Sequence, residues 1–192
     1  MKRRVVLAGL GLPWLGLPSI AGAEVASVVD AAAALRRGGV AVLLRHAATE
    51  PGIGDPPGFR LGVCATQRQL SEQGRAQSQR IGAWFSARGL APAEVRSSAW
   101  CRCLDTATLA FGRARAWTAL NSFFGDRSVE SGQSAELRKA LGKLPAQGFE
   151  VWVTHQVNIS ALTGVSPGMG EAVVVRLAGG KVHNLARIRF ED

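Results

Sequence analysis

The chain has 192 residues, of which 47% are hydrophobic and 19% are charged. This length allows one domain with a substantial core and is short for two. The formal net charge of +9 is compatible with nucleic acid, with anionic membrane surfaces or with a phosphorylated substrate. The basic residues are scattered along the chain and do not alternate with stacking aromatic residues, so we expect no nucleic-acid partner.

The first 23 residues have the three-part plan of a secretory signal peptide. "MKRR" is a basic start, an apolar run of 16 residues follows, and "AGA" precedes Glu24. An uncleaved membrane anchor is the alternative, but the run is short for a span and contains two prolines. The Arg-Arg pair leaves export by the twin-arginine route open. We predict a signal peptide over 1–23 and a mature domain over 24–192. This domain is expected in the periplasm or outside the cell, without a stable membrane span.

Helix-forming segments and short apolar runs alternate along the mature chain. In chain order they predict a helix over 25–38, a strand over 40–45, a loop over 47–69, a helix over 70–90, a strand over 93–98, a helix over 99–112, a strand over 114–120, a loop over 121–134, a helix over 135–145, a strand over 149–155, a helix over 156–164 and a hairpin over 171–190. Ser71 is the expected N-cap of the second helix, and Gly112 and Gly164 are expected to end two others. The alternation predicts an α/β fold, a three-layer sandwich with a mostly parallel central sheet and an antiparallel edge.

Basic side chains gather where three of the predicted strands end. Arg45 and His46 follow the first strand, Arg102 lies one turn into the helix after the second, and His155 ends the strand "FEVWVTH". Ligands of such sheets bind outside the carboxyl ends of the strands. We therefore expect two arginines and two histidines at one edge of the sheet.

This set of residues suits phosphoryl transfer. Guanidinium groups match the oxygens of a phosphate in a bidentate way. A neutral imidazole can attack phosphorus, and a second imidazole can donate a hydrogen bond to the oxygens that gain charge. No group of carboxylates resembles a magnesium site, and three cysteines without a nearby histidine are a poor zinc site. We expect no metal and no cofactor.

The segments "LLRHAAT", "SSAWCRCLDTA" and "VTHQVNI" resemble the three signature segments of the histidine phosphatase (phosphoglycerate mutase-like) superfamily. They come in the same order, and the resemblance covers roughly residues 38–177. It implies a phosphoglycerate mutase-like fold. It also implies a phosphatase that hydrolyses a small phosphorylated substrate through a phosphohistidine intermediate.

The resemblance assigns roles residue by residue. His46 corresponds to the nucleophile, Arg45 and Arg102 to the phosphate-binding arginines, and His155 to the second histidine of the pocket. Thr49 is the implied polar contact to the substrate. The family usually has Gly after the Arg-His pair, where this chain has Ala47, which is a mild change.

The proton donor is the serious departure. Many members carry Glu in the segment after the third strand, and "LNSFFGDRSVE" places Ser122 at that position. Asp126 is the nearest carboxylate and is our candidate acid, with Glu130 behind it. For each of these two residues, a solvated loop acid without a role in catalysis is an equally good interpretation. If no acid is present, the alternative function is a protein of the same fold that binds phosphate or a phosphosugar with little or no turnover.

The predicted loops over 47–69 and 121–134 are the candidates for substrate selection. Arg60 and Arg68 are candidate ligands for a second anionic group, although such arginines are more often surface residues. Export and small size resemble the lipopolysaccharide core heptose phosphatases more than the glycolytic mutases. A sugar phosphate is therefore one candidate substrate.

Cysteine usage agrees with export. Cys64, Cys101 and Cys103 make an odd number, and an oxidising compartment favours one disulfide and one thiol. Cys101 and Cys103 are too close in sequence to bridge each other comfortably. Cys64 is predicted to pair with one of these two.

Overall fold

A computed structural model describes residues 28–190 of the chain. The predicted signal peptide, residues 1–23, lies outside these residues. Among residues 28–190, no helix is both long and apolar enough to cross a membrane.

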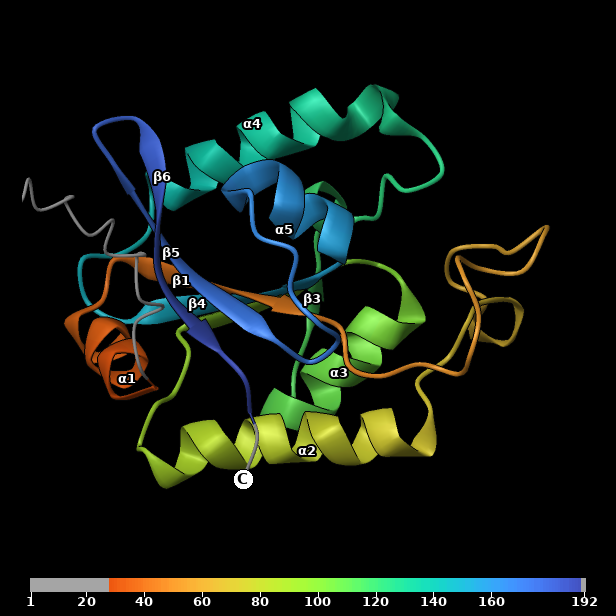
Figure 1. Ribbon diagram of the computed structural model, residues 1–192, viewed down its shortest axis with the longest axis horizontal. Helices are drawn as coiled ribbons and strands as arrows, with labels where there is room; N and C mark the ends of the chain where they lie inside the picture. Colours follow the sequence, from red (N-terminus) through yellow and green to blue (C-terminus); the bar gives the residue numbers. More distant parts are fainter. Residues whose placement is uncertain (1–27, 191–192) are drawn as a thin grey trace, which may run out of the picture.

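One sheet of six strands forms the centre of the molecule (Figure 1). The strand order is β3-β2-β4-β1-β5-β6. The strands are β1 (Val40–Arg45), β2 (Glu94–Ser97), β3 (Arg115–Ala116), β4 (Phe149–Thr154), β5 (Ala172–Ala178) and β6 (Lys181–Ile188). The first four in this order are parallel, whereas β5 and β6 run antiparallel to their neighbours. The predicted parallel sheet with an antiparallel edge is confirmed.

Helices cover both faces of the sheet. They are α1 (Val28–Arg37), α2 (Glu72–Ala87), α3 (Cys101–Phe111), α4 (Glu130–Leu141) and α5 (Gln156–Thr163), with short 3-10 helices η1 (Cys64–Thr66), η2 (Thr118–Leu120) and η3 (Arg127–Val129). Figure 1 shows α1, α2 and α3 below the sheet and α4 and α5 above it. The three-layer sandwich expected from the sequence is confirmed.

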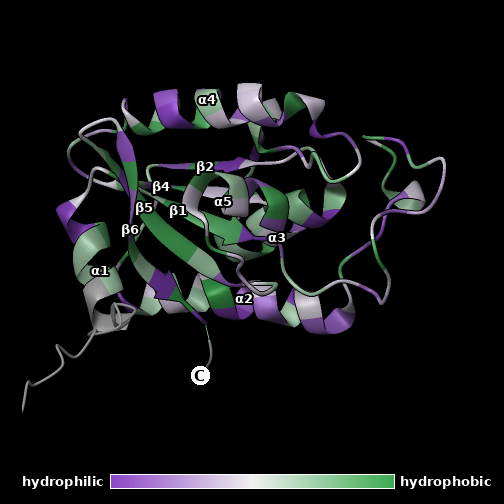
Figure 2. Ribbon diagram, turned by 45° about the horizontal axis from the view of Figure 1, so that its top comes forward, coloured by the Kyte–Doolittle hydropathy of each residue, from purple (hydrophilic) through white to green (hydrophobic). Residues whose placement is uncertain are grey.

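Two hydrophobic cores result from the alternation of side chains along the strands. In β1, Val40, Val42 and Leu44 pack into the core on the side of α1, α2 and α3, while Ala41 and Leu43 pack into the core of α4 and α5. Because both faces are buried, this strand is a continuous apolar run and not an alternating one. Figure 2 shows the central strands β1, β4 and β5 mostly in the hydrophobic colour, whereas hydrophilic and hydrophobic residues mix along α2 and α4.

The predicted third strand, 114–120, is wrong for most of its length. Only Arg115–Ala116 pair with β2, and the chain then turns into η2. The turn buries Ala119 and Leu120 in the core below α4. An apolar run of this length fits a strand or a buried turn equally well, so its pattern did not separate them.

Helix α4 begins at Glu130, five residues before the predicted start at 135. Its first turns, "ESGQS", are polar and contain a glycine, so they have no apolar periodicity. Glu130 in the first turn interacts favourably with the helix dipole. The predicted loop over 121–134 is correspondingly shorter.

The N-terminus of α2 is fixed next to the strand end that carries His46. Ser71 caps the helix as predicted, since its side chain accepts a hydrogen bond from the Gly74 amide. A Cβ atom at Gly74 would lie 1.8 Å from the carbonyl oxygen of Ala48. Only glycine therefore allows this close approach of the helix to the segment after His46.

Candidate active site

The strand ends bring the two predicted histidines together. In the parallel pairing of β1 with β4, Arg45 is the partner of Thr154, and the His46 amide donates to the Thr154 carbonyl at 3.0 Å. His46 and His155 therefore leave the sheet at the same level. Their ring centroids are 5.5 Å apart, with an interplanar angle of 67°.

His46 is buried and electrically neutral. Its Nδ1 lies 2.9 Å from the carbonyl oxygen of Ala47, so Nδ1 carries the proton and Nε2 keeps a free lone pair. The Ala47 amide donates to Thr106 Oγ1 at 3.1 Å, which fixes this turn of the chain. Burial lowers the pKa of His46 to about 3, and the nearby charges of Arg102 and Arg45 act in the same direction.

Arg45, Arg68 and Arg102 lie close enough to the histidine pair for their charges to lower the pKa of both rings. Arg45 donates to the Pro167 carbonyl at 2.8 Å, and Arg68 donates to the Gly52 carbonyl at 2.6 Å. The Nε atoms of Arg45, Arg68 and Arg102 are buried without a hydrogen-bond partner among the residues described. An oxyanion bound between these arginines would provide the missing acceptors.

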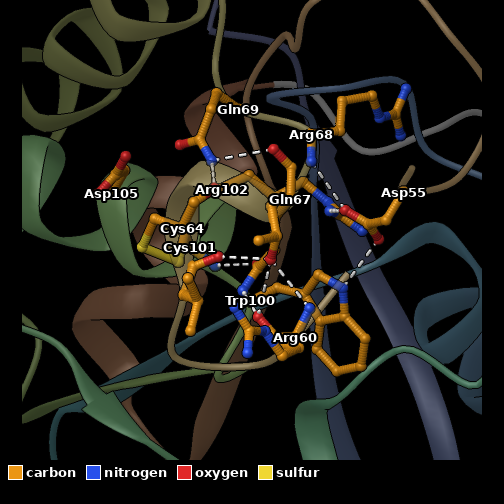
Figure 3. Close-up of a disulfide and its surroundings, with 12 residues drawn as sticks. Asp55, Arg60, Cys64, Gln67, Arg68, Gln69, Trp100, Cys101, Arg102 and Asp105 are labelled. Atoms are coloured by element: carbon orange, nitrogen blue, oxygen red, sulfur yellow. Dashed lines mark hydrogen bonds and ion pairs between the residues drawn. A yellow bond between two sulfur atoms is a disulfide. The ribbon is translucent and has the colours of Figure 1, made fainter. Parts of the chain in front are cut away.

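Asp55 belongs to this site, and the sequence analysis did not identify it. Its Oδ1 lies 2.7 Å from Arg102 Nη1, and both side chains are almost fully buried, at 7% and 4% exposed. Trp100 Nε1 donates to Oδ2 at 2.9 Å, and the Arg68 amide donates to Oδ1 at 3.0 Å (Figure 3). Burial alone would raise the pKa of Asp55, but the hydrogen bonds from Arg102 and Arg68 outweigh it and leave the pKa below its ordinary value.

His155 is held by polar neighbours on a second side of the site. Its Nε2 lies 2.9 Å from Ser98 Oγ and 3.5 Å from Cys103 Sγ. Ser98 Oγ in turn lies 3.3 Å from Asn121 Oδ1, a residue the sequence analysis also missed. Burial first, then the neighbouring His46, lowers the pKa of His155 well below its usual value. Both histidines of the site are therefore neutral at ordinary pH.

The predicted disulfide is confirmed, and of the two candidates Cys101 is the residue that pairs with Cys64. Cys64 is bonded to Cys101, with the Cα atoms 5.6 Å apart. Figure 3 shows this bond next to the residues that surround Arg102. It ties the loop over 47–69 to the first turn of α3, directly before Arg102. Cys103 is free and buried, and burial raises its pKa to about 12.

Thr49 and Arg60, two candidate substrate contacts, lie in different surroundings. Thr49 is buried, its Oγ1 donates to Met169 Sδ at 3.8 Å, and it pairs with Leu70 at the base of the loop. Arg60 is exposed, and its backbone amide donates to Thr66 Oγ1 at 2.9 Å. Its guanidinium has no hydrogen bond or ion pair within residues 28–190. Thr49 therefore lies at the inner end of the loop and Arg60 on its outer surface.

The structure does not bring Asp126 to this site. The side chain is exposed and accepts a hydrogen bond from the Ser128 amide at 2.9 Å as the N-cap of η3. The bonds to Ser128 lower the pKa of Asp126, which disfavours the protonated form that an acid needs. Glu130 pairs with Arg127 at 2.7 Å. Ser122, expected from the sequence at the position of the family's acid, accepts a hydrogen bond from the Phe124 amide.

The charge of the site matches a phosphate dianion. Three arginines and one aspartate leave two positive charges, because both histidines are neutral. Among residues 28–190, no group of three or more His, Cys, Asp or Glu side chains is placed to hold a metal ion.

Solved structures of several phosphatases share this architecture. The protein histidine phosphatase SixA, complexed with tungstate, matches with a TM-score of 0.57 and 15% identity over 79% of this chain and 97% of SixA. The chain has a histidine phosphatase fold. A mutant phosphoserine phosphatase from Entamoeba histolytica, in complex with phosphoserine, matches with a TM-score of 0.56 and 15% identity over 79% of this chain and 98% of that one.

A mycobacterial glucosyl-3-phosphoglycerate phosphatase also matches, with a TM-score of 0.53 and 17% identity over 79% of this chain and 97% of that one. No protein-family model matches the sequence, and no curated protein matches it either. The likeness therefore lies in the fold. The phosphoglycerate mutase-like fold expected from the sequence is confirmed. In this chain His46 directly follows β1 and His155 directly follows β4, at the carboxyl ends of the two strands.

Proposed function

We propose that the mature chain is an exported phosphomonoesterase that hydrolyses its substrate through a phosphoryl group carried on His46. One observation carries this proposal. His46 is a buried, neutral imidazole whose Nδ1 is held by Ala47 and whose Nε2 is free, and it lies among Arg45, Arg68 and Arg102. An imidazole with a free lone pair is a nucleophile toward phosphorus, and the arginines supply the charge that binds the phosphate.

The reaction has two steps. In the first, Nε2 of His46 attacks phosphorus and a P–N bond forms as the bond to the ester oxygen breaks. The electron pair of the broken bond stays on that oxygen, which takes up a proton and leaves as the alcohol. In the second step, water attacks the phosphohistidine, and the electrons of the P–N bond return to Nε2. Inorganic phosphate is released, and a proton from the water returns to the protein.

His155 is the donor to the oxygens that gain charge in this reaction. Ser98 Oγ lies 2.9 Å from Nε2 of the ring and 3.3 Å from Asn121 Oδ1, and its single proton can be donated to only one of them. When the hydroxyl donates to the nearer Nε2, the proton of the ring stays on Nδ1. This N–H then donates to an oxygen of the transferring phosphoryl group. A donor placed in advance in this way stabilises the transition state without reorganisation. The Trp100 amide donates to Ser98 Oγ at 3.3 Å, which helps to fix the hydroxyl.

The substrate is a small phosphate monoester, and a sugar phosphate is the first to test. The solved structures named above are phosphatases for a protein histidine, for phosphoserine and for glucosyl-3-phosphoglycerate. The predicted export and the small size of the domain, two features in which it resembles the lipopolysaccharide core heptose phosphatases, favour a sugar among these classes. Thr49 and Arg68 line the inner part of the loop over 47–69 and contact the substrate near the phosphate. Arg60, farther out, contacts a second anionic group.

Two features support a location in the periplasm or outside the cell. Residues 1–23 have the sequence of a signal peptide. The Cys64–Cys101 bond lies next to the proposed site, and disulfides persist mainly in oxidising compartments.

The proposal is tested by measuring phosphate release from the purified mature chain, 24–192, with sugar, lipid and nucleotide monoesters. The matched control is His46→Asn, which keeps a polar side chain of similar size. We expect release from at least one monoester and none above background from the variant. If the wild type binds the esters and releases no phosphate, the chain is a phosphate-binding protein of the same fold. Equal release by His46→Asn would exclude His46 as the nucleophile.

A further inference from the structure

Asp55 is the carboxylate that lies inside the site. Within residues 28–190, seven ion pairs join arginines to carboxylates. Among the three arginines of the site, Arg102 takes part in such a pair, with Asp55, whereas Arg45 and Arg68 do not within this part of the chain. The Asp55–Arg102 pair is also the one in which both side chains are less than a tenth exposed. A buried carboxylate next to the phosphate-binding arginine has a different environment from the solvated acids of the 121–134 segment.

We propose that Asp55 is the proton donor of the reaction and that the substrate phosphate displaces it from Arg102, leaving it protonated beside the ester oxygen. This inference rests on the function proposed above, because it assigns a role within the same reaction. It replaces Asp126, the acid expected from the sequence.

The exchange on Arg102 follows from the charges. In the free protein the Asp55 carboxylate occupies Nη1 of Arg102 at 2.7 Å, where it takes the place of an oxyanion. A phosphate dianion competes for the same guanidinium and brings two negative charges close to the carboxylate. The negative charges of the phosphate favour the protonated, neutral form of the buried Asp55 side chain, just as one carboxyl group of a close pair keeps its proton. The hydrogen bonds from Arg102 and Arg68 now hold the pKa of Asp55 down, so losing Arg102 raises it.

The loop keeps Asp55 at the site when it leaves Arg102. Trp100 Nε1 donates to Oδ2 at 2.9 Å, independently of the arginine. Phe59, four residues farther along the loop, packs on Trp100 with ring centroids 5.8 Å apart. The Cys64–Cys101 bond closes the other end of the loop onto the residue after Trp100. These contacts allow a small shift of the carboxyl group without release of the loop.

The protons balance over the two steps. When His46 Nε2 attacks phosphorus, the breaking bond leaves its electron pair on the ester oxygen, which takes the proton of Asp55 and leaves as an alcohol. Asp55 is then a carboxylate, and it accepts the proton of the water that attacks the phosphohistidine. Inorganic phosphate leaves, and Asp55 pairs again with Arg102. No other reactant is needed.

The first test compares two esters by kcat/KM, which reports formation of the phosphohistidine and not its hydrolysis. Glucose 6-phosphate has a poor leaving group that needs a proton, whereas para-nitrophenyl phosphate has a leaving group that departs without one. Asp55→Asn is expected to lower kcat/KM on the order of 10² to 10⁴-fold for the sugar ester and less than about 10-fold for the aryl ester. Asp55→Glu should recover part of the loss. Asp105→Asn removes the partly buried partner of the exposed Arg75 and is the matched control, with no change expected.

A second test needs no turnover. Tungstate, an analogue of the phosphate dianion, is titrated into the mature chain by calorimetry near neutral pH in two buffers of different ionisation enthalpy. The wild type should take up about one proton per tungstate and Asp55→Asn none. Uptake of no proton by the wild type would overturn the proposal, as would equal losses on both esters in Asp55→Asn. A loss confined to Asp126→Asn would return the role to that residue. If the wild type binds tungstate with proton uptake and hydrolyses neither ester, the proposed function fails and the exchange on Arg102 stands.

Discussion

His46 and His155 lie in contact, edge to face, although one follows β1 and the other follows β4. Their ring centroids are 5.5 Å apart, and both rings are buried among three cationic arginines. Two imidazoles in such surroundings remain neutral, because a proton on either would be poorly solvated and repelled by the arginines. This shared neutrality serves the proposed chemistry and has a cost in stability at low pH.

The first prediction concerns acid sensitivity. An unfolded histidine binds a proton near its ordinary pKa of 6.5, whereas folded His46 does so only near 3. Between these values the unfolded state binds more protons, so the free energy of unfolding must fall as the pH falls. We expect a loss on the order of 1 kcal/mol per pH unit for each of His46 and His155 below about pH 6.5. Urea unfolding in phosphate-free buffer, between neutral pH and the titration range of the carboxylates, measures it.

The control for this measurement is His183→Asn, since His183 is exposed on β6. That variant should keep the slope of the wild type, whereas His46→Asn and His155→Asn should each reduce it. Identical slopes in all four proteins would mean that the two buried histidines are not neutral in the folded state.

The second prediction concerns the disulfide. The Cys64–Cys101 bond spans a sequence separation of 37 residues, so the loop-closure model gives it about 3–4 kcal/mol of stability. Replacing both cysteines by serine should lose this stability and free the loop that carries Asp55 and Arg68. We expect kcat/KM to fall on the order of 10-fold through a raised KM, as pre-organisation of the loop is lost. Urea unfolding and steady-state kinetics measure the two effects.

Reduction of the wild type should reproduce both effects, and reductant added to the double variant should change nothing. If the reduced wild type kept full stability and full activity, the bond would have no part in holding the loop at the site.

The third prediction concerns Arg102. The guanidinium binds two oxygens with fixed geometry, which a lysine cannot do. Arg102→Ala is expected to lower kcat on the order of 10² to 10³-fold, as for the loss of a donor to the transition state. Arg102→Lys should recover only part of this loss. Arg75→Ala removes an exposed arginine at the fourth residue of α2 and is the control, with no change of kcat expected. Hydrolysis of para-nitrophenyl phosphate measures all three, and full activity in Arg102→Lys would argue against bidentate binding.

The strand ends were predictable from the sequence, because buried runs such as "VAVLL" and "EVWV" leave little choice of element. Once the sheet was expected to be parallel, the position of Arg45, His46 and His155 at one edge followed from topology alone. The resemblance to a known family identified the same residues independently. The position of Arg102 in the first turn of α3 was also as expected.

Asp55 was not predictable in the same way. It lies in "GIGDPPG", where glycine and proline indicate a loop and nothing indicates burial. Its burial depends on two contacts from the start of α3, which only the folded chain brings together. One is the indole of Trp100, the N-cap of the helix, and the other is the guanidinium of Arg102. Asp126 has an equally ordinary sequence context, yet it remains exposed as a helix cap. Local sequence could not separate the two acids.

The most direct test of the account is the identification of a phosphoryl group on His46. The mature chain is mixed rapidly with para-nitrophenyl phosphate, quenched at high pH, digested and analysed by mass spectrometry. We expect one phosphoryl group on the peptide that contains His46, stable in base and lost in acid, and absent from His46→Asn. A phosphoryl group on another residue, or full turnover by His46→Asn, would contradict the account.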